Sequence, residues 1–231
     1  MKSHTTLIAA SMLALAMNSA FAAAKVELNV AGAITPATCR VNLPNGDTAS
    51  FGSINLGTLN PTQSTPIGSG KLSLRIACDS ATSVVLKTFN HSDASKPTEP
   101  RPFTFAGGEV VLSENSYSGL GFAAGSDSTP IGAYAVKIGA PIVDGIENPN
   151  LVMSADGEFW SYAGDSTNYF NVVSPYISAA SRLHPVDSAT LSKASTFVFP
   201  FEVAGNITMT SALPNEEIEF SGSTAIEVSY L

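Results

Sequence analysis

The chain has 231 residues, a formal net charge of −8 and a charged fraction of only 13%. An acidic chain without a basic patch is a poor candidate for binding nucleic acid or an anionic membrane surface. The length allows one large domain, or two small ones, with a packed core.

The first 22 residues have the pattern of a secretory signal peptide. Lys2 gives a basic start, residues 7–17 form an apolar run, and Ala20 and Ala22 occupy the positions that a signal peptidase reads. The alternative is a membrane anchor, but the apolar run is too short to span a bilayer comfortably. We predict cleavage after Ala22, with a shift of one or two residues left open by the alanines that follow, and export of residues 23–231.

An alternating stretch opens the predicted mature chain. Val26, Leu28 and Val30 fall on one side of an extended chain together with Gly32, and mostly polar or small residues fall on the other. A period of two with β-branched residues predicts a half-buried strand. The pattern alone leaves open an ordinary first strand that pairs within its own domain.

The chain has two cysteines, Cys39 and Cys78. An even number of cysteines in an exported chain predicts a disulfide, which here would close a loop of about 40 residues. The alternatives are a metal pair or a catalytic thiol, but neither cysteine has a histidine nearby and the spacing is poor for zinc.

The remaining sequence predicts an all-β fold of the sandwich or barrel type. Short apolar alternations recur between Gly, Pro, Asn, Asp and Ser clusters, which is typical of such folds. Predicted strands or strand edges lie at residues 39–43, 51–59, 71–78, 82–89, 109–112, 119–124, 131–138, 151–153, 196–203, 206–209 and 224–231. Residues 60–70 are predicted as a polar connection, and residues 179–183 are the best candidate for a short helix.

Two features of the later sequence bear on function. Residues 156–175 are polar and aromatic and contain the single tryptophan, Trp160, so some of these rings are expected to be exposed. In the last eight residues, Ile226, Val228 and Tyr230 share one face of a predicted strand, which is expected to be paired.

Together these features resemble the pilin subunits of chaperone–usher fimbriae. The N-terminal segment, with Gly32 seven residues before Cys39, resembles a pilin donor strand, and the spacing from Cys39 to Cys78 fits the pilin disulfide. The segment 51–57 and the penultimate Tyr230 add to the resemblance. It covers residues 25–89 and about the last fifteen residues.

The chain also departs from the pilin pattern. The family carries a glycine about fourteen residues from the C-terminus, where this chain has Ile218, and the nearest glycine is Gly222. The chain is longer than a common major pilin, with the excess in residues 100–195. The resemblance is therefore to a divergent, fimbrial-like subunit.

The resemblance implies an immunoglobulin-like, pilin-type β-sandwich (residues 39–231) that lacks its last strand. Residues 23–38 would be a donor-strand extension that fills the groove of another subunit by strand addition. The groove-filling residues would be Val26, Leu28, Val30 and Ile34, with Gly32 at a point too shallow for a side chain. Ile226, Val228 and Tyr230 would form the C-terminal strand that contacts the chaperone and edges the groove.

The partners implied are identical or related subunits, a periplasmic chaperone and an outer-membrane usher, and the destination is a cell-surface fimbria. No cofactor and no enzymatic activity are predicted. A phosphate loop at Lys71 fails at neighbouring positions, and His91, Ser92 and Asp93 are sequence neighbours that do not make a triad. The alternatives are a minor or tip subunit, or a secreted β-sandwich protein, that recognises a host or surface ligand.

Overall fold

The computed structural model describes residues 38–90, 93–123, 128–164, 168–183 and 189–231. The chain divides into residues 1–35 and residues 36–231, and the described residues belong to the second unit. The predicted signal peptide and the N-terminal strand with Val26, Leu28, Val30, Gly32 and Ile34 lie outside the described residues, as do His91 and Ser92.

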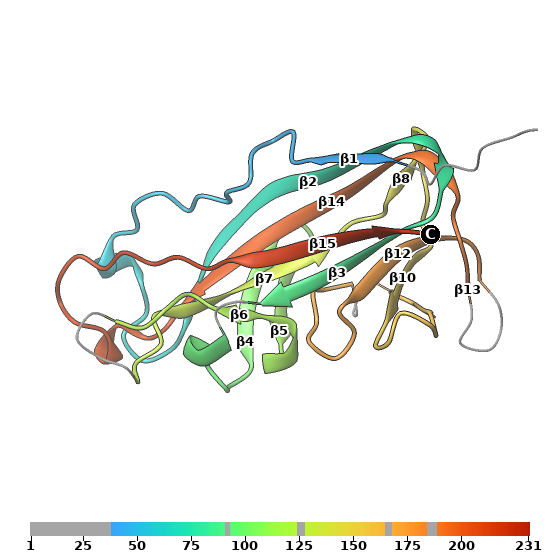
Figure 1. Ribbon diagram of the computed structural model, residues 1–231. Coiled ribbons are helices and arrows are strands. Elements are labelled where there is room, and N and C mark those ends of the chain that lie inside the picture. Colours follow the sequence, from blue (N-terminus) through green and yellow to red (C-terminus); the bar gives the residue numbers. More distant parts are fainter. Residues whose placement is uncertain (1–37, 91–92, 124–127, 165–167, 184–188) are drawn as a thin grey trace, which may run out of the picture. The chain divides into compact units, whose positions relative to one another are not determined.

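The described part of the chain is all-β and contains no α-helix, as the sequence predicts (Figure 1). Four short 3₁₀ turns are found at Leu56–Thr58, Asp93–Ser95, Glu114–Ser116 and Thr210–Ala212. The strands are β1 (Cys39–Asn42), β2 (Thr65–Thr82), β3 (Val84–Asn90), β4 (Arg101–Phe105), β5 (Gly108–Leu112), β6 (Ser118–Gly119), β7 (Gly132–Ile138), β8 (Ile142–Val143), β9 (Ile146–Glu147), β10 (Leu151–Ser154), β11 (Ser161–Tyr162), β12 (Tyr176–Leu183), β13 (Ala189–Leu191), β14 (Ala194–Ile207) and β15 (Thr224–Tyr230).

Two large antiparallel sheets carry the fold. The first sheet has the order β1-β2-β14-β7-β6, with β8 and β9 attached beside β14. The second sheet has the order β11-β10-β12-β3-β15, with β13 beside β12. The last strand, β15, pairs with β3 along its whole length and forms one edge of the second sheet.

The main core lies between these two sheets. In β14, Phe197, Phe199 and Phe201 alternate into it, and β3 contributes Val84 and Leu86 from the opposite sheet. This period-two burial explains why the phenylalanine-rich sequence forms a strand rather than a helix. The predicted strand at 196–203 is therefore confirmed.

Pro200 interrupts this strand without ending it. We expected an edge strand or a bulge there, because proline cannot donate a ladder hydrogen bond. The strand is instead central, and Pro200 lies where the neighbour of β14 changes from β7 to β8. Its carbonyl still accepts a hydrogen bond from the Gly139 N–H at 2.8 Å.

A two-stranded hairpin, β4–β5, adds a second core on the other face of the first sheet. Phe103 and Phe105 of β4 pack with Ala133 and Ala135 of β7 and with Tyr169. Strand β7 is therefore buried on both faces, which accounts for its almost continuous apolar sequence.

A buried polar pair joins this hairpin to β14. The guanidinium of Arg101 donates from Nη1 to Oδ1 of Asn206 at 2.9 Å, and both side chains are buried. The Asn206 amide nitrogen in turn donates to the Pro102 carbonyl at 2.8 Å. Burial lowers the pKa of Arg101 by removing the guanidinium from water.

Replacing this asparagine is expected to destabilise the fold. Asn206→Ala leaves a buried guanidinium without its acceptor, which should lower the free energy of unfolding by about 3 kcal/mol. Urea unfolding of the full chain measures the effect. Asn215→Ala, at an exposed asparagine, should change stability by less than about 0.5 kcal/mol. Equal effects of the two substitutions would contradict the assigned role of Asn206.

Several sequence predictions are wrong. Residues 179–183 lie in β12, because Ala179 and Ala180 are fully buried on opposite faces of that strand and tertiary packing outweighs local helix preference. Residues 51–59 form no paired strand; they are an unpaired stretch followed by a 3₁₀ turn. The predicted connection at 60–70 is shorter than expected, because β2 begins at Thr65.

Candidate functional site

A long groove lies between two segments of the chain, and no described strand lies between them to pair with both. One segment, residues 43–54, follows β1, and the other, residues 213–223, leads into β15. The groove has a volume of about 1200 Å³, which exceeds the roughly 300–1,000 Å³ of ordinary small-molecule sites. The two segments run in opposite directions along the molecule (Figure 1).

The floor of the groove belongs to the main core. It is made by the inward faces of β2, β7 and β14, through Leu72, Tyr134, Val136, Phe201 and Val203. Large apolar side chains from both flanks point toward the same space and remain partly exposed: Leu43, Phe51, Ile54, Leu56, Leu59, Leu213, Ile218, Phe220 and Ile226. The groove is therefore an incompletely covered part of the hydrophobic core.

The first flank has unpaired main-chain groups. Within the described structure, residues 47–54 make no main-chain hydrogen bond to other main-chain groups, and the nearest such bond is from Gly46 N–H to the Leu43 carbonyl. Gly52, at a φ of +63°, bends the flank where an L side chain would be strained. The Gly52 N–H donates to the Ser50 hydroxyl at 3.3 Å. The remaining amide and carbonyl groups of this extended segment, beside an apolar floor, form an edge that a further strand would satisfy.

The second flank has the same property. The described residues 214–223 make no main-chain hydrogen bond, while Ile218 and Phe220 alternate inward and Glu217 and Glu219 point outward. The flank continues into β15, whose edge away from β3 has no pairing partner among the described strands. A strand lying in the groove could therefore pair with both flanks, antiparallel to one and parallel to the other.

A glycine holds the second flank close to the floor. A Cβ atom added at Gly222 would collide with the ring of Tyr134 on β7. The Tyr134 hydroxyl lies 2.7 Å from Oγ1 of Thr224, the first residue of β15, so the contact is hydrogen-bonded as well as close. Gly222 is thus needed for a close approach, and Ile218, earlier in the same flank, lines the groove.

The rim of the groove is acidic. Asp47 lies on the first flank and Glu216, Glu217 and Glu219 lie on the second, and the residues that line the groove include no Lys, Arg or His. Like-charge repulsion at this rim favours a partner strand with few acidic side chains on its outward face. The apolar floor favours alternating apolar side chains on its inward face.

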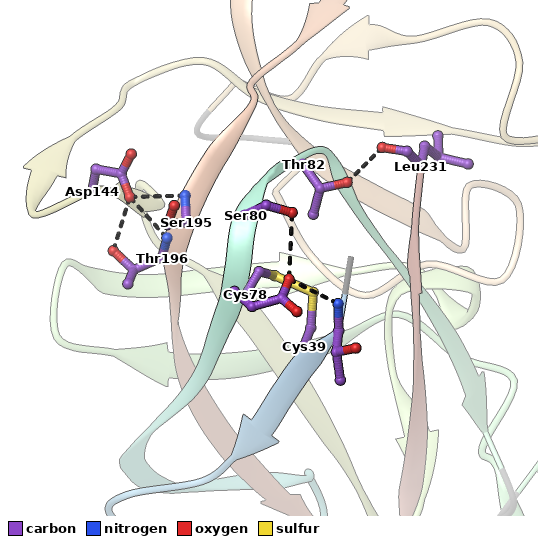
Figure 2. Close-up of a disulfide and its surroundings, with 10 residues drawn as sticks. Cys39, Cys78, Ser80, Thr82, Asp144, Ser195, Thr196 and Leu231 are labelled. Atoms are coloured by element: carbon purple, nitrogen blue, oxygen red, sulfur yellow. Dashed lines mark hydrogen bonds between the residues drawn. A yellow bond between two sulfur atoms is a disulfide. The ribbon is translucent and has the colours of Figure 1, made fainter. Parts of the chain in front are cut away.

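The disulfide fixes the start of the first flank. Cys39 of β1 and Cys78 of β2 lie directly opposite each other and are bonded, which confirms the predicted disulfide (Figure 2). The Thr38 N–H donates to the Asp79 carboxylate at 3.0 Å just before β1. Thr38 and Cys39 are therefore tied to β2 where β1 begins.

The C-terminus is tied down near the same place. The Leu231 carbonyl accepts a hydrogen bond from the Thr82 hydroxyl at 2.6 Å (Figure 2), and the Leu231 N–H donates to the Ser83 carbonyl. The predicted strand at 224–231 is confirmed as β15. Ile226 lines the groove, Val228 packs on the main core beside it, and Tyr230 is 44% exposed outside the groove lining.

Other kinds of site find little support in the described part of the chain. It holds no group of three or more His, Cys, Asp or Glu side chains that could bind a metal ion. The carboxylate of Asp144 accepts hydrogen bonds from the Ser195 and Thr196 main chain and ties the end of β8 to β14 (Figure 2). No described helix is long and apolar enough to cross a membrane.

The described residues form an all-β protein with two main antiparallel sheets and a long, apolar-floored groove. A family model described as "Protein of unknown function (DUF1120)" matches residues 28–135. That match begins inside the predicted N-terminal strand and ends in β7.

The chain is also similar to the "Uncharacterized protein YhcF" of Escherichia coli (strain K12). The two are 25% identical over 236 aligned residues, which cover 92% of this chain and 93% of that protein. The similarity therefore extends over both the groove and the middle region.

Proposed function

We propose that this chain is a structural subunit of a bacterial surface fimbria that polymerises by strand addition. The observation that carries the proposal is the groove: an apolar floor between two extended flanks, residues 47–54 and 214–223, that make no main-chain to main-chain hydrogen bond within the described residues. A missing strand is the simplest structure that satisfies both features at once, because it supplies main-chain hydrogen bonds and alternating apolar side chains together.

The occupant we propose is the N-terminal segment of another copy of this chain or of a related subunit. Its inward residues would be Val26, Leu28, Val30 and Ile34, with Gly32 between them. Their period of two matches the spacing that a strand presents to one side. Each subunit would then complete its neighbour and extend the fibre by its own N-terminal arm.

An open groove of this kind is a liability before assembly. Unpaired edges and exposed apolar side chains favour aggregation, so the subunit needs a protein that covers the groove first. We propose a periplasmic chaperone for this role, with an outer-membrane usher as the site of assembly and the cell-surface fimbria as the destination. The proposal involves no catalytic activity and no cofactor.

A direct test of this function is isolation from the periplasm. The full chain, expressed with its first 22 residues, is expected to purify as a one-to-one complex with an immunoglobulin-like chaperone. Fibres made from it should run as ladders of non-covalent multimers after mild heating in detergent. A stable monomer that needs no chaperone and gives no ladder would contradict the proposal.

The second candidate function is recognition of a surface ligand by the middle region. It is favoured by the exposed aromatic side chains of Phe159, in the loop between β10 and β11, and Tyr162, on β11, neither of which lines the groove. The two functions are compatible, since a fibre subunit can carry a ligand site away from its assembly groove.

A further inference from the structure

A second hollow lies at the β11 edge of the second sheet. It has a volume of about 440 Å³ and is formed by the loop between β10 and β11 together with residues 171–174 ahead of β12. We call it the aromatic hollow; its lining residues are Met153, Ser154, Ala155, Asp156, Phe159, Ser161, Tyr162, Ala163, Asn171 and Ser174. None of these residues lines the long groove between residues 43–54 and 213–223, which we call the strand groove.

Two rings border the aromatic hollow and face solvent. Phe159 is 65% exposed and Tyr162 is 55% exposed, whereas Trp160 between them is only 5% exposed and packs with Val152 and Ala180 on the outer face of the sheet. The loop thus has one aromatic side chain that anchors it and two that face outward. Large apolar side chains that are exposed together around a hollow are typical of a binding surface, whereas single exposed apolar residues are common everywhere.

The loop is held in place before any ligand arrives. Oδ1 of Asp156 accepts hydrogen bonds from the N–H groups of Glu158 at 2.8 Å and Phe159 at 3.0 Å, and from the Ser154 hydroxyl at 2.9 Å. The Ser154 hydroxyl oxygen also accepts from the Gly157 N–H at 2.9 Å. The bonds from Phe159, Glu158 and Ser154 to the carboxylate lower the pKa of Asp156, because they stabilise its ionised form.

The hollow also has polar atoms that make no hydrogen bond within the described structure. Within the described residues, the hydrogen bonds to the Asp156 carboxylate all go to Oδ1, which leaves Oδ2 as an acceptor. Asn171 uses its Oδ1 to accept from the Val173 N–H at 2.7 Å, which leaves its amide nitrogen as a free donor. The hydroxyls of Ser161 and Ser174 can act in either sense.

We propose that the aromatic hollow binds a neutral saccharide. A sugar ring presents C–H groups on its faces, which pack on Phe159 and Tyr162, and hydroxyls on its rim, which both donate and accept. A carboxylate oxygen and an amide nitrogen are the complementary pair for such hydroxyls, and the volume lies within the range of small-ligand sites.

The charges of the hollow select against other ligands. Asp156 lines it, Glu158 is adjacent in the same loop, and the lining residues include no Lys, Arg or His. An anionic sugar or a phosphorylated ligand would meet like charge without a compensating cation. A neutral ligand avoids this repulsion and still uses the free oxygen of Asp156.

The test is binding of saccharides to the full chain, purified in its chaperone complex or, if the chain is stable without a chaperone, alone, by saturation-transfer NMR and calorimetry. The probes are the methyl glycosides of mannose, galactose and glucose, N-acetylglucosamine, and short oligosaccharides of each, with N-acetylneuraminic acid as the anionic comparison. At least one neutral probe should bind. Phe159→Ala, Tyr162→Ala and Asp156→Asn should each weaken that binding by about tenfold or more.

Val111→Ala is the matched control, since Val111 is an exposed apolar residue on β5 outside the hollow; it should leave binding unchanged. The emission of Trp160, the single tryptophan, should stay that of a buried indole in every variant, which shows that the loop is folded.

Three outcomes would overturn the proposal. They are the absence of neutral saccharide binding up to about 10 mM, tighter binding of N-acetylneuraminic acid, or a dimer of the free chain that Phe159→Ala dissolves. Multimer ladders should be normal in Phe159→Ala, so failure of this site and failure of the strand groove are distinguishable.

Discussion

Gly32→Phe is expected to slow fibre growth by about 10- to 100-fold, which corresponds to roughly 1–3 kcal/mol for forcing a side chain into a filled groove. Gly32 lies on the same side of the predicted arm as Val30, so a phenylalanine there would point at the groove floor. The arm could then enter the groove only by losing pairing with a flank. The measurement is the rate at which multimers appear when purified chaperone-bound subunits are mixed.

The control for this substitution is Ala33→Phe. Ala33 faces the other side of the predicted arm, so the same ring would point to solvent and should leave the rate within a factor of about two. Chaperone complexes of both variants should form normally, because the arm is outside the groove at that stage. Normal fibre growth by Gly32→Phe would show that residue 32 does not face the floor.

The double substitution Cys39→Ser with Cys78→Ser is expected to cause the largest loss of stability. A disulfide that closes a loop of this size, with a sequence separation of 39, contributes about 4 kcal/mol in the chain-entropy model. Typical domains have only about 5–15 kcal/mol in total. We expect the urea midpoint of the full chain to fall accordingly, and little of the variant to accumulate in the periplasm.

The disulfide also has a local consequence for the groove. It joins β1 to β2 at the start of the first flank, so its loss should free residues 43–54 before the rest of the sandwich unfolds. Hydrogen exchange in this segment should therefore rise more than in β14. Reductant supplies the matched comparison: it should destabilise the wild-type chain and leave the double variant unchanged. Equal urea midpoints for both chains would contradict the assigned role.

Much of the body could be predicted because its strands satisfy local and tertiary preferences together. The alternation in residues 224–231 predicts β15 to within one residue, and the paired cysteines predict the contact between β1 and β2. The aromatic alternation at Phe197, Phe199 and Phe201 likewise matches the inward face of β14. In each case the apolar face in the sequence is the face that the core buries.

The groove could not be predicted in the same way. Residues 217–220 alternate like a strand and residues 51–59 were predicted as a strand or strand edge, yet neither segment is paired in the described structure. Alternation reports which side of an extended chain is buried, and it carries no information on whether a neighbour supplies hydrogen bonds. The inward Ile218 and Phe220, with outward Glu217 and Glu219, are the signal that could have indicated this flank.

Residues 156–175 show a similar limit: the sequence does not indicate which of their aromatic rings are exposed. Residues 156–175 were expected to expose aromatic rings, and Phe159 and Tyr162 do so while Trp160, Tyr169 and Phe170 are buried. Which ring is exposed depends on the Asp156 turn and on packing against the outer face of the second sheet. The packing contacts join Trp160 to segments far apart in the chain, and composition does not reveal them.

The most direct test of strand addition between copies is disulfide trapping across two tagged populations. One population carries Glu27→Cys, Asn29→Cys or Ala31→Cys on the outward side of the N-terminal arm, and the other carries Glu227→Cys on the outward side of β15. We predict a cross-linked dimer that contains both tags with at least one arm position. Glu109→Cys on β5 should replace Glu227→Cys without giving that dimer. The absence of a mixed dimer, combined with an internal cross-link when both cysteines are in one chain, would contradict the account.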